Sequence, residues 1–292
     1  MANITANNIN IEYETFGKKS SPPLLLIMGL GAQMIFWDDD FCSMLAEKDH
    51  YVIRFDNRDI GLSTKFENAG VPDIMQAMNA VSRGEKVSSP YSIDDMADDA
   101  AGLLDSLGIE KSNICGASMG GMIAQTIAIR HPSKVLGLIS IMSSTGDPGL
   151  PQAKPEAMNV LMMPAPKERE ANIEFSVKTF KIIGSTGFPF DEARMRKKAE
   201  MSFDRAFYPQ GMARQLLAII AHGDRTSKLK AVSKPTLVIH GSADPLVPVE
   251  AGKATARAIP GARLLIIEGM GHDLPSGSWP QIIDAIYEIT HK

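Results

Sequence analysis

The sequence predicts an α/β fold built on a mostly parallel sheet. Short apolar runs of strand length, such as residues 24–28 and 51–55, alternate along the chain with segments of helical periodicity. Such runs are typical of strands buried on both faces, as in a parallel sheet covered by helices. The alternation is interrupted once, over residues 145–231, where only helical patterns occur. A chain of 292 residues is long enough for one large α/β domain carrying an inserted subdomain.

Composition and charge exclude several classes of function. The net charge of −4 argues against a nucleic-acid partner, because phosphate binding needs a concentrated basic surface. Residues 24–28, the longest apolar run near the N-terminus, are too few to span a bilayer, and no basic region followed by an apolar run precedes them. We therefore expect a cytoplasmic protein without a membrane partner. Cys42 falls in a predicted helix and Cys115 in an apolar strand, which favours buried, reduced thiols.

The first part of the chain predicts an edge hairpin followed by two buried strands. Residues 4–16 alternate between apolar and polar side chains, and Pro22-Pro23 ends that pattern. Asp56 and Arg58 follow the second buried strand, and we expect them to form a structural ion pair. The expected elements are a hairpin at 4–16, a strand at 24–28, a helix at 37–48, a strand at 51–55, a short helix near 74–81, and a helix from the N-cap Ser92 to Leu107, before Gly108.

A nucleophile elbow is predicted at Gly116-Ala117-Ser118-Met119-Gly120. A short apolar run ends in this motif, and an apolar helical pattern over residues 119–131 follows directly. A strained nucleophilic serine needs this order of strand, sharp turn and helix, and the flanking glycines let strand and helix approach closely. A glycine-rich strand-to-helix loop without chemistry is the alternative. A further buried strand is expected at 135–142.

A helical cap is predicted between two parts of the core. Residues 145–231 contain no convincing strand, and prolines punctuate their beginning. We expect residues 1–144 and 232–292 to form the core domain and residues 145–231 to form the cap subdomain. The expected helices of the cap lie at 167–183, 191–204 and 209–222. After the cap we expect a strand at 236–240, a helix at 248–259, a strand at 262–267 and a closing helix at 278–290.

Three polar side chains follow three separate predicted strands. Ser118 ends the elbow strand, Asp244 follows the strand at 236–240, and His272 follows the strand at 262–267. Because the carboxyl ends of parallel strands meet at one edge of a sheet, these side chains are expected to converge. Acyl transfer by serine needs a base for the hydroxyl proton and a carboxylate that holds the imidazole, and Ser, Asp, His is the chain order expected of this sheet. We therefore predict a catalytic triad.

Other candidates fit these roles less well. His240 lies inside or at the end of its strand and is expected to pack there. His222 ends a cap helix that overhangs the site, which favours a structural or rim position. Asp273 is next to His272 in the chain and therefore points elsewhere if His272 faces the serine. Asp56 is a weaker third member than an aspartate directly after a strand and before a proline.

The Gly29-x-Gly31 pattern does not predict a dinucleotide site. Met34 stands where the third glycine of that motif would be needed, and no acidic residue ends a matching second strand. The loop is instead expected to place backbone N–H groups beside the elbow.

Together these motifs resemble the α/β-hydrolase family over essentially the whole chain. The residues that carry the resemblance are Met28-Gly29-Leu30-Gly31, Asp56-Asn57-Arg58-Asp59-Ile60-Gly61-Leu62-Ser63, the elbow, Gly241-Ser242-Ala243-Asp244-Pro245-Leu246-Val247-Pro248 and Gly269-Met270-Gly271-His272. Within the family, residues 184–191 and 271–275 are similar to the branch that contains aclacinomycin methylesterase. The resemblance implies that the backbone N–H of Leu30 joins that of Met119 as an oxyanion donor. Many relatives have His-Gly where this chain has Met28-Gly29, which alters the floor of the pocket.

The sequence thus predicts a carboxylesterase-type serine hydrolase that works through an acyl-enzyme. Ser118 attacks the ester carbonyl, His272 takes its proton, and Asp244 orients the imidazole. No metal-ligand or cofactor motif is present, and no cofactor is expected. Lactone opening, C–C bond hydrolysis and perhydrolysis use the same three groups, and a non-catalytic ligand-binding receptor can share the fold.

The expected partner is a small-molecule ester of small to medium size and hydrophobic character. We predict that Met28, Met158, Met162, Phe188 and His222 contact the substrate, because methionine-rich walls adapt to irregular apolar ligands. The alternative is that the apolar cap residues simply bury the cap against the core. The sequence leaves the oligomeric state open.

Overall fold

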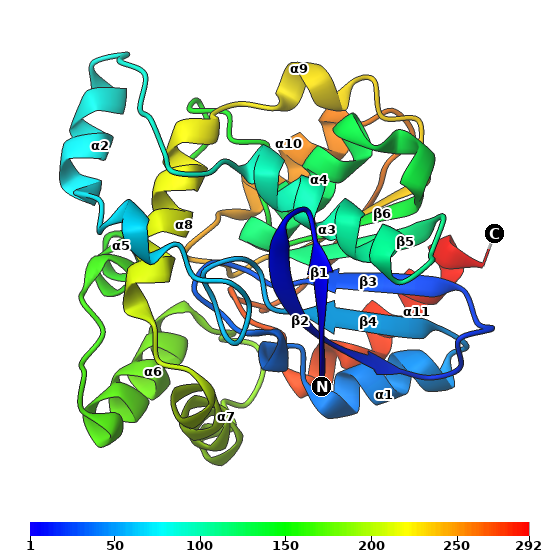
Figure 1. The fold of residues 1–292 in the computed structure, drawn as a ribbon, viewed down its shortest axis with the longest axis horizontal. Coiled ribbons are helices and arrows are strands. Elements are labelled where there is room, and N and C mark those ends of the chain that lie inside the picture. The colour runs from blue at the N-terminus through cyan, green and yellow to red at the C-terminus, as the bar shows by residue number, and fades with distance from the viewer. Residues whose placement is uncertain (292) are drawn as a thin grey trace.

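The computed structural model describes residues 1–291, and eight strands in this range form one sheet in the order β1-β2-β4-β3-β5-β6-β7-β8 (Figure 1). The β1–β2 hairpin lies at one edge, and β2 also runs antiparallel to β4, whereas all other neighbours are parallel. The predicted α/β class with a mostly parallel sheet is therefore confirmed. The strands are β1 (Ala2–Ala6), β2 (Ile9–Phe16), β3 (Pro23–Ile27), β4 (Tyr51–Phe55), β5 (Ser112–Ala117), β6 (Val135–Ile141), β7 (Thr236–Gly241) and β8 (Arg263–Ile267).

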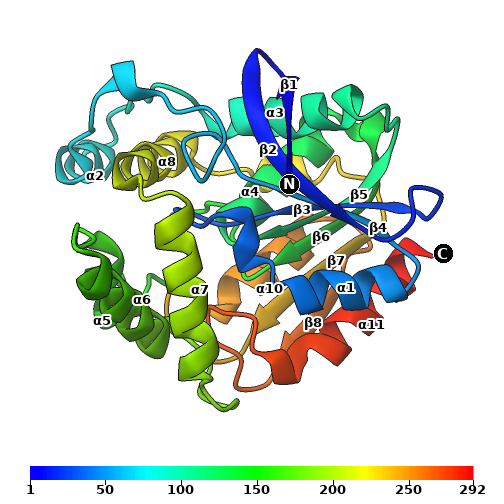
Figure 2. The same ribbon diagram turned by 60° about the horizontal axis from the view of Figure 1, so that its bottom comes forward.

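The central strands are apolar because both of their faces are covered. Along β3, Leu25 and Ile27 belong to one core cluster, whereas Leu24 and Leu26 belong to the other, as the period of two in a strand requires. The first cluster contains residues of α3 and α4, and the second contains residues of α1 and α11. Figure 2 shows these helices on opposite sides of the sheet, so the molecule has three layers.

The helices begin and end close to their predicted limits. The N-cap Ser92 of α3 accepts from the N–H of Asp95, whose side chain accepts from the N–H of Ser92, which completes a capping box. The helices are α1 (Asp39–Glu47), α2 (Ile74–Ser82), α3 (Ile93–Ser106), α4 (Met119–Arg130), α5 (Pro155–Met162), α6 (Arg169–Ile183), α7 (Glu192–Arg205), α8 (Pro209–His222), α9 (Thr226–Leu229), α10 (Val249–Ala258) and α11 (Trp279–Thr290).

Two short helices were not predicted. Helix α5 starts with Pro155, which in the sequence looks like one more breaker in a proline-rich stretch. Proline is well suited to the first helical position, since its missing N–H would have no partner there. Helix α9 has a single turn, which is too short for a periodic pattern to appear.

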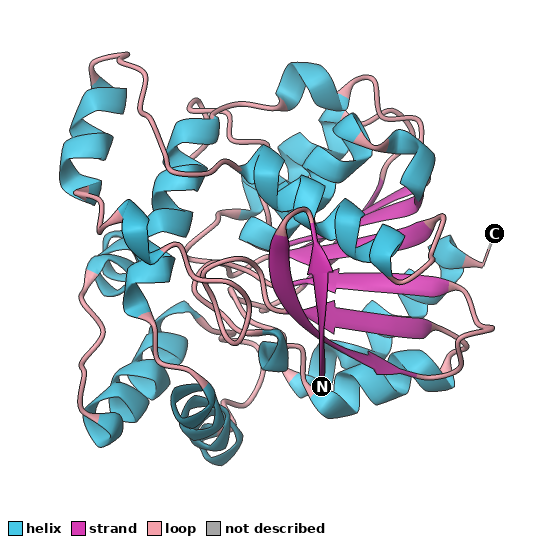
Figure 3. Ribbon diagram, in the orientation of Figure 1, coloured by secondary structure: helices cyan, strands magenta, loops and turns pink. Residues whose placement is uncertain are grey.

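The segment between β6 and β7, residues 145–231, is called here the insertion. It consists of α5–α9 and loops, and α5–α8 lie beyond the sheet on the same side of the molecule as α2 (Figures 1 and 3). Helices α6 and α7 bury Ile173, Val177, Met195 and Ala199 in a small cluster of their own. The insertion therefore has a minor core of its own, in addition to the two clusters that cover the sheet.

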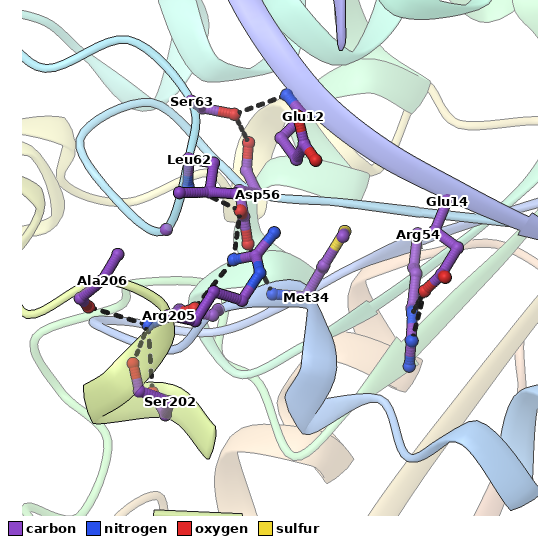
Figure 4. Close-up of polar contacts among 12 residues, drawn as sticks. Glu12, Glu14, Met34, Arg54, Asp56, Leu62, Ser63, Ser202, Arg205 and Ala206 are labelled. Atoms are coloured by element: carbon purple, nitrogen blue, oxygen red, sulfur yellow. Dashed lines mark hydrogen bonds and ion pairs between the residues drawn. The ribbon is translucent and has the colours of Figure 1, made fainter. Parts of the chain in front are cut away.

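The expected ion pair between Asp56 and Arg58 is wrong. Asp56 is fully buried and pairs with Arg205 of the insertion at 2.6 Å, while it also accepts from two backbone N–H groups (Figure 4). Arg58 instead donates to Asp99 of α3, with Nε at 2.6 Å from Oδ2. The loop after β4 is thus fixed by partners that are distant in the chain.

None of the helices in the described part of the chain combines the length and apolarity needed to cross a membrane.

Candidate active site

The turn between β5 and α4 has the geometry of a nucleophile elbow. Ser118 adopts φ 56° and ψ −119°, which is strained for a residue with a side chain. A Cβ on Gly116 would lie 1.9 Å from the carbonyl oxygen of Gly120, and one on Gly120 would lie 2.0 Å from that of Ile27. Only glycine fits either position, because strand and helix are in backbone contact. The turn also receives a hydrogen bond from the hydroxyl of Ser143 to the carbonyl of Ser118.

Ser118, His272 and Asp244 form one hydrogen-bonded chain. Ser118 Oγ lies 3.0 Å from His272 Nε2, and His272 Nδ1 lies 2.7 Å from Asp244 Oδ2. A neutral imidazole with its proton on Nδ1 satisfies both contacts, so that Nδ1–H donates to the carboxylate and Nε2 accepts the serine proton. Asp244 Oδ1 accepts from the N–H groups of Leu246 and Val247, at 2.9 and 2.8 Å. The three residues predicted from strand ends are therefore brought together.

The competing candidates lie elsewhere. His240 is fully buried 3.6 Å from Asp244 Oδ2, but its Nε2–H donates to the carbonyl of Val247 at 2.7 Å, and burial lowers its pKa. Asp273 accepts from the Ser185 hydroxyl at 2.5 Å, and burial raises its pKa. Neither residue contacts Ser118 Oγ among the hydrogen bonds of the described chain.

Two backbone N–H groups beside Ser118 have no acceptor within residues 1–291. These are the N–H of Met119, the first residue of α4, and the N–H of Leu30, in the loop after β3. The loop contacts the elbow, since a Cβ on Gly29 would lie 3.1 Å from Ser118 Cβ. Unpaired N–H groups at a helix N-terminus and in an adjacent loop form an environment that favours negative charge.

A cavity of about 540 Å³ opens onto this site. Ser118, His272, Leu30 and Met119 belong to its lining, and most of the remaining wall is apolar. Volumes of about 300–1,000 Å³ are usual for small-molecule sites. Further lining residues, which the sequence did not single out, include Met122, Met142, Phe175, Phe203, Phe207 and Met212.

Two of the five predicted substrate contacts line this cavity and three do not. Met28 and Met158 are lining residues. Met162 is absent from the lining, Phe188 packs against the core cluster that contains Trp279, and His222 faces Asp94 of α3 at 3.8 Å. Apolar residues of one helix can face a cavity or another layer of the fold, and their spacing in the sequence does not distinguish these two positions.

Residues 22–275 match the family model described as alpha/beta hydrolase fold, and the chain belongs to this family. Rhodomycin D methylesterase DnrP of Streptomyces peucetius is 28% identical over 293 residues, covering 93% of this chain and 92% of that protein. The 3-oxoadipate enol-lactonase 2 of Acinetobacter baylyi is 26% identical, covering 91% and 87%. Among solved structures, a thermophilic esterase of Thermogutta terrifontis has a TM-score of 0.72 at 25% identity, covering 98% and 96%. These similarities confirm the family resemblance seen in the sequence.

Proposed function

We propose that this protein hydrolyses carboxylic esters through a Ser118 acyl-enzyme. The observation that carries the proposal is the position of His272, which bridges Ser118 Oγ and Asp244 Oδ2 at the wall of a largely apolar cavity. The similarity to a methylesterase and to a solved esterase supports the same reaction class.

In the acylation step Ser118 Oγ attacks the ester carbonyl carbon while His272 Nε2 accepts the hydroxyl proton. Asp244 stabilises the imidazolium that forms and holds its ring in place. The carbonyl oxygen becomes an oxyanion, which accepts from the N–H groups of Leu30 and Met119. Collapse of the tetrahedral intermediate breaks the C–O bond, and His272 gives its proton to the departing alcohol.

Deacylation repeats these steps with water as the nucleophile. His272 removes a proton from water, the hydroxide adds to the acyl carbon, and the second intermediate expels Ser118 Oγ, which takes the proton back. The products are an acid and an alcohol, and the serine hydroxyl is restored. Each proton transfer uses the same imidazole nitrogen, which already lies 3.0 Å from Ser118 Oγ.

The insertion acts in this proposal as a cap that selects hydrophobic substrates. Its helices α5–α8 contribute Met158, Phe175, Phe203 and Met212 to the cavity wall. Aromatic and methionine side chains adapt to irregular apolar ligands, and few charged groups reach the lining. A preference for small charged esters over hydrophobic ones would contradict this part of the proposal.

The test is hydrolysis of p-nitrophenyl esters from acetate to octanoate at neutral pH. We expect Ser118→Ala to abolish turnover, since loss of a triad serine typically lowers kcat by up to about 10⁶-fold. Ser82→Ala, an exposed serine of α2, is the matched control and should retain full activity. If the folded wild type is no faster than Ser118→Ala on any ester, the proposed function is wrong.

A further inference from the structure

The loop that carries Leu30 is held by three side chains from two other parts of the chain, the loop after β4 and helix α8. We define the oxyanion loop as residues 28–34, which connect β3 to the 3-10 helix Met34–Phe36. At its start, Asn57 Nδ2 donates to the carbonyl of Met28 at 2.9 Å. At its end, the N–H of Met34 donates to Asp56 Oδ1 at 2.8 Å. Between them, the N–H of Gly31 donates to Gln215 Oε1 at 2.9 Å.

These contacts hold the peptide units on both sides of the Leu30 N–H. That N–H belongs to the peptide between Gly29 and Leu30. The carbonyl of Met28 belongs to the preceding peptide and the N–H of Gly31 to the following one. Because peptide units are rigid planes, holding both neighbours restricts the direction of the N–H between them. Gly31 has φ +69°, a conformation that favours glycine, and a Cβ on it would lie 2.9 Å from the side chain of Met212.

Gln215 belongs to α8 of the insertion and is fully buried. Its amide nitrogen donates to the carbonyl of Arg58 at 2.9 Å, so the two ends of the amide have different partners. Reversing the amide would place its NH₂ against the N–H of Gly31 and its oxygen against the carbonyl of Arg58, and would leave buried groups unpaired. The acceptor therefore stays directed at the oxyanion loop.

We propose that Gln215 is a positioning residue for the oxyanion hole. Through the Gly31 N–H it directs the Leu30 N–H at the developing oxyanion, so the hole is complete only when α8 of the insertion is docked. This inference rests on the proposed function, since it assigns Leu30 the role given there. It makes the insertion a part of the catalytic machinery as well as a wall of the cavity.

Helix α8 is anchored by contacts that do not involve Gln215. Arg214 of the same helix pairs with the buried Asp59, with Nε at 2.8 Å from Oδ2. Arg205, at the end of the preceding helix, pairs with Asp56 at 2.6 Å (Figure 4). Removing the Gln215 amide is therefore expected to leave the insertion docked, which separates positioning from docking.

The experiment compares Gln215→Met with Gln125→Met. Methionine keeps the length and removes both hydrogen bonds, and Gln125 is an equally buried amide on α4 that contacts Ser140 and Arg225 rather than the oxyanion loop. For Gln215→Met we expect kcat on p-nitrophenyl esters to fall about 10- to 100-fold with KM changed less than about threefold, because loss of an oxyanion donor lowers kcat by about 10²–10³. Gln125→Met should lower the melting temperature without this selective loss of kcat.

A second variant and a second readout cover the other outcomes. Gln215→Glu keeps an acceptor for the Gly31 N–H, so its kcat should lie between those of wild type and Gln215→Met. If Gln215→Met does not fold, Gln215→Glu is compared with wild type instead. The rate at which a fluorophosphonate labels Ser118 also depends on the oxyanion hole, because the phosphoryl oxygen occupies it. If the wild type labels but hydrolyses no ester, the proposed function fails and the labelling ratio still tests Gln215. Equal kcat and equal labelling in a folded Gln215 variant and wild type, or an equal kcat loss in Gln125→Met, would overturn the inference.

Discussion

Replacing His222 by glutamine should make the protein less sensitive to acid. The side chain of His222 is 9% exposed at the C-terminal end of α8, and burial together with the charge of Arg225 lowers its pKa from 6.5 to about 4. Because the pKa of His222 is lower in the folded protein, the unfolded chain binds a proton at pH values where the folded chain does not. The stability contributed by the neutral imidazole is therefore present above pH 6.5 and is lost as pH falls toward 4. The charged groups around it are Asp94, Arg130, Arg225 and Lys228.

The magnitude follows from the two pKa values. At about pH 5 the unfolded histidine is almost fully protonated and the folded one almost fully neutral, which corresponds to about 2 kcal/mol of lost stability. At about pH 7 the same difference is below roughly 0.2 kcal/mol. Raising the folded pKa by a whole unit changes the value at about pH 5 by only a few tenths of a kcal/mol, so the expected loss stays near 2 kcal/mol.

The assay is urea unfolding of wild type and His222→Gln at about pH 7, 6 and 5. Other groups titrate equally in both proteins, so the difference between the two unfolding free energies isolates His222. Wild type should lose about 2 kcal/mol more than the variant between about pH 7 and 5. A difference that does not change with pH would refute the reasoning. Because His222 lies outside the cavity lining, KM for esters should be the same in both proteins.

Three further outcomes are expected. Asp244→Asn should lower kcat by about 10⁴-fold in a folded protein, and a loss below tenfold would contradict its role. Arg205→Met leaves the buried Asp56 without its cation and should cost about 3 kcal/mol in urea unfolding, with partial recovery on adding Asp56→Asn; an unchanged midpoint would count against the pair. Cys42 and Cys115 should resist thiol reagents until the protein is unfolded, because burial raises both thiol pKa values, that of Cys42 to about 12; rapid native labelling would disprove this.

The layers of the fold were predictable because their signals are local. A strand covered on both faces must be apolar at every position, so Leu24–Ile27 is recognisable without knowledge of its neighbours. The convergence of Ser118, Asp244 and His272 followed from a geometric rule, since residues after parallel strands share one edge of the sheet. Each of these strands, with the polar residue that follows it, can be recognised from a window of about ten residues.

The contacts between the insertion and the core were not predictable in this way. Asp56 and Arg58 are close in sequence, and pairing them satisfied both charges, yet Asp56 binds Arg205 and Arg58 binds Asp99. The sequence contains both acidic and basic side chains, but it does not show which acid forms an ion pair with which base. The same holds for the cavity, because a methionine on an amphipathic helix is equally apolar whether it faces a ligand site or another helix.

The burial of charge nevertheless explains how the insertion is held against the core. A carboxylate buried beside an active site must find a cation or several donors, because an unpaired buried charge costs several kcal/mol. Asp56 and Asp59 lie in the loop after β4, and both take their cations from the insertion, as Arg205 and Arg214. Docking of α7 and α8 is thus enforced by charge burial, and it brings the amide of Gln215 to the oxyanion loop. The acids of this loop thus have cations of the insertion as partners, which is consistent with neither belonging to the proposed triad.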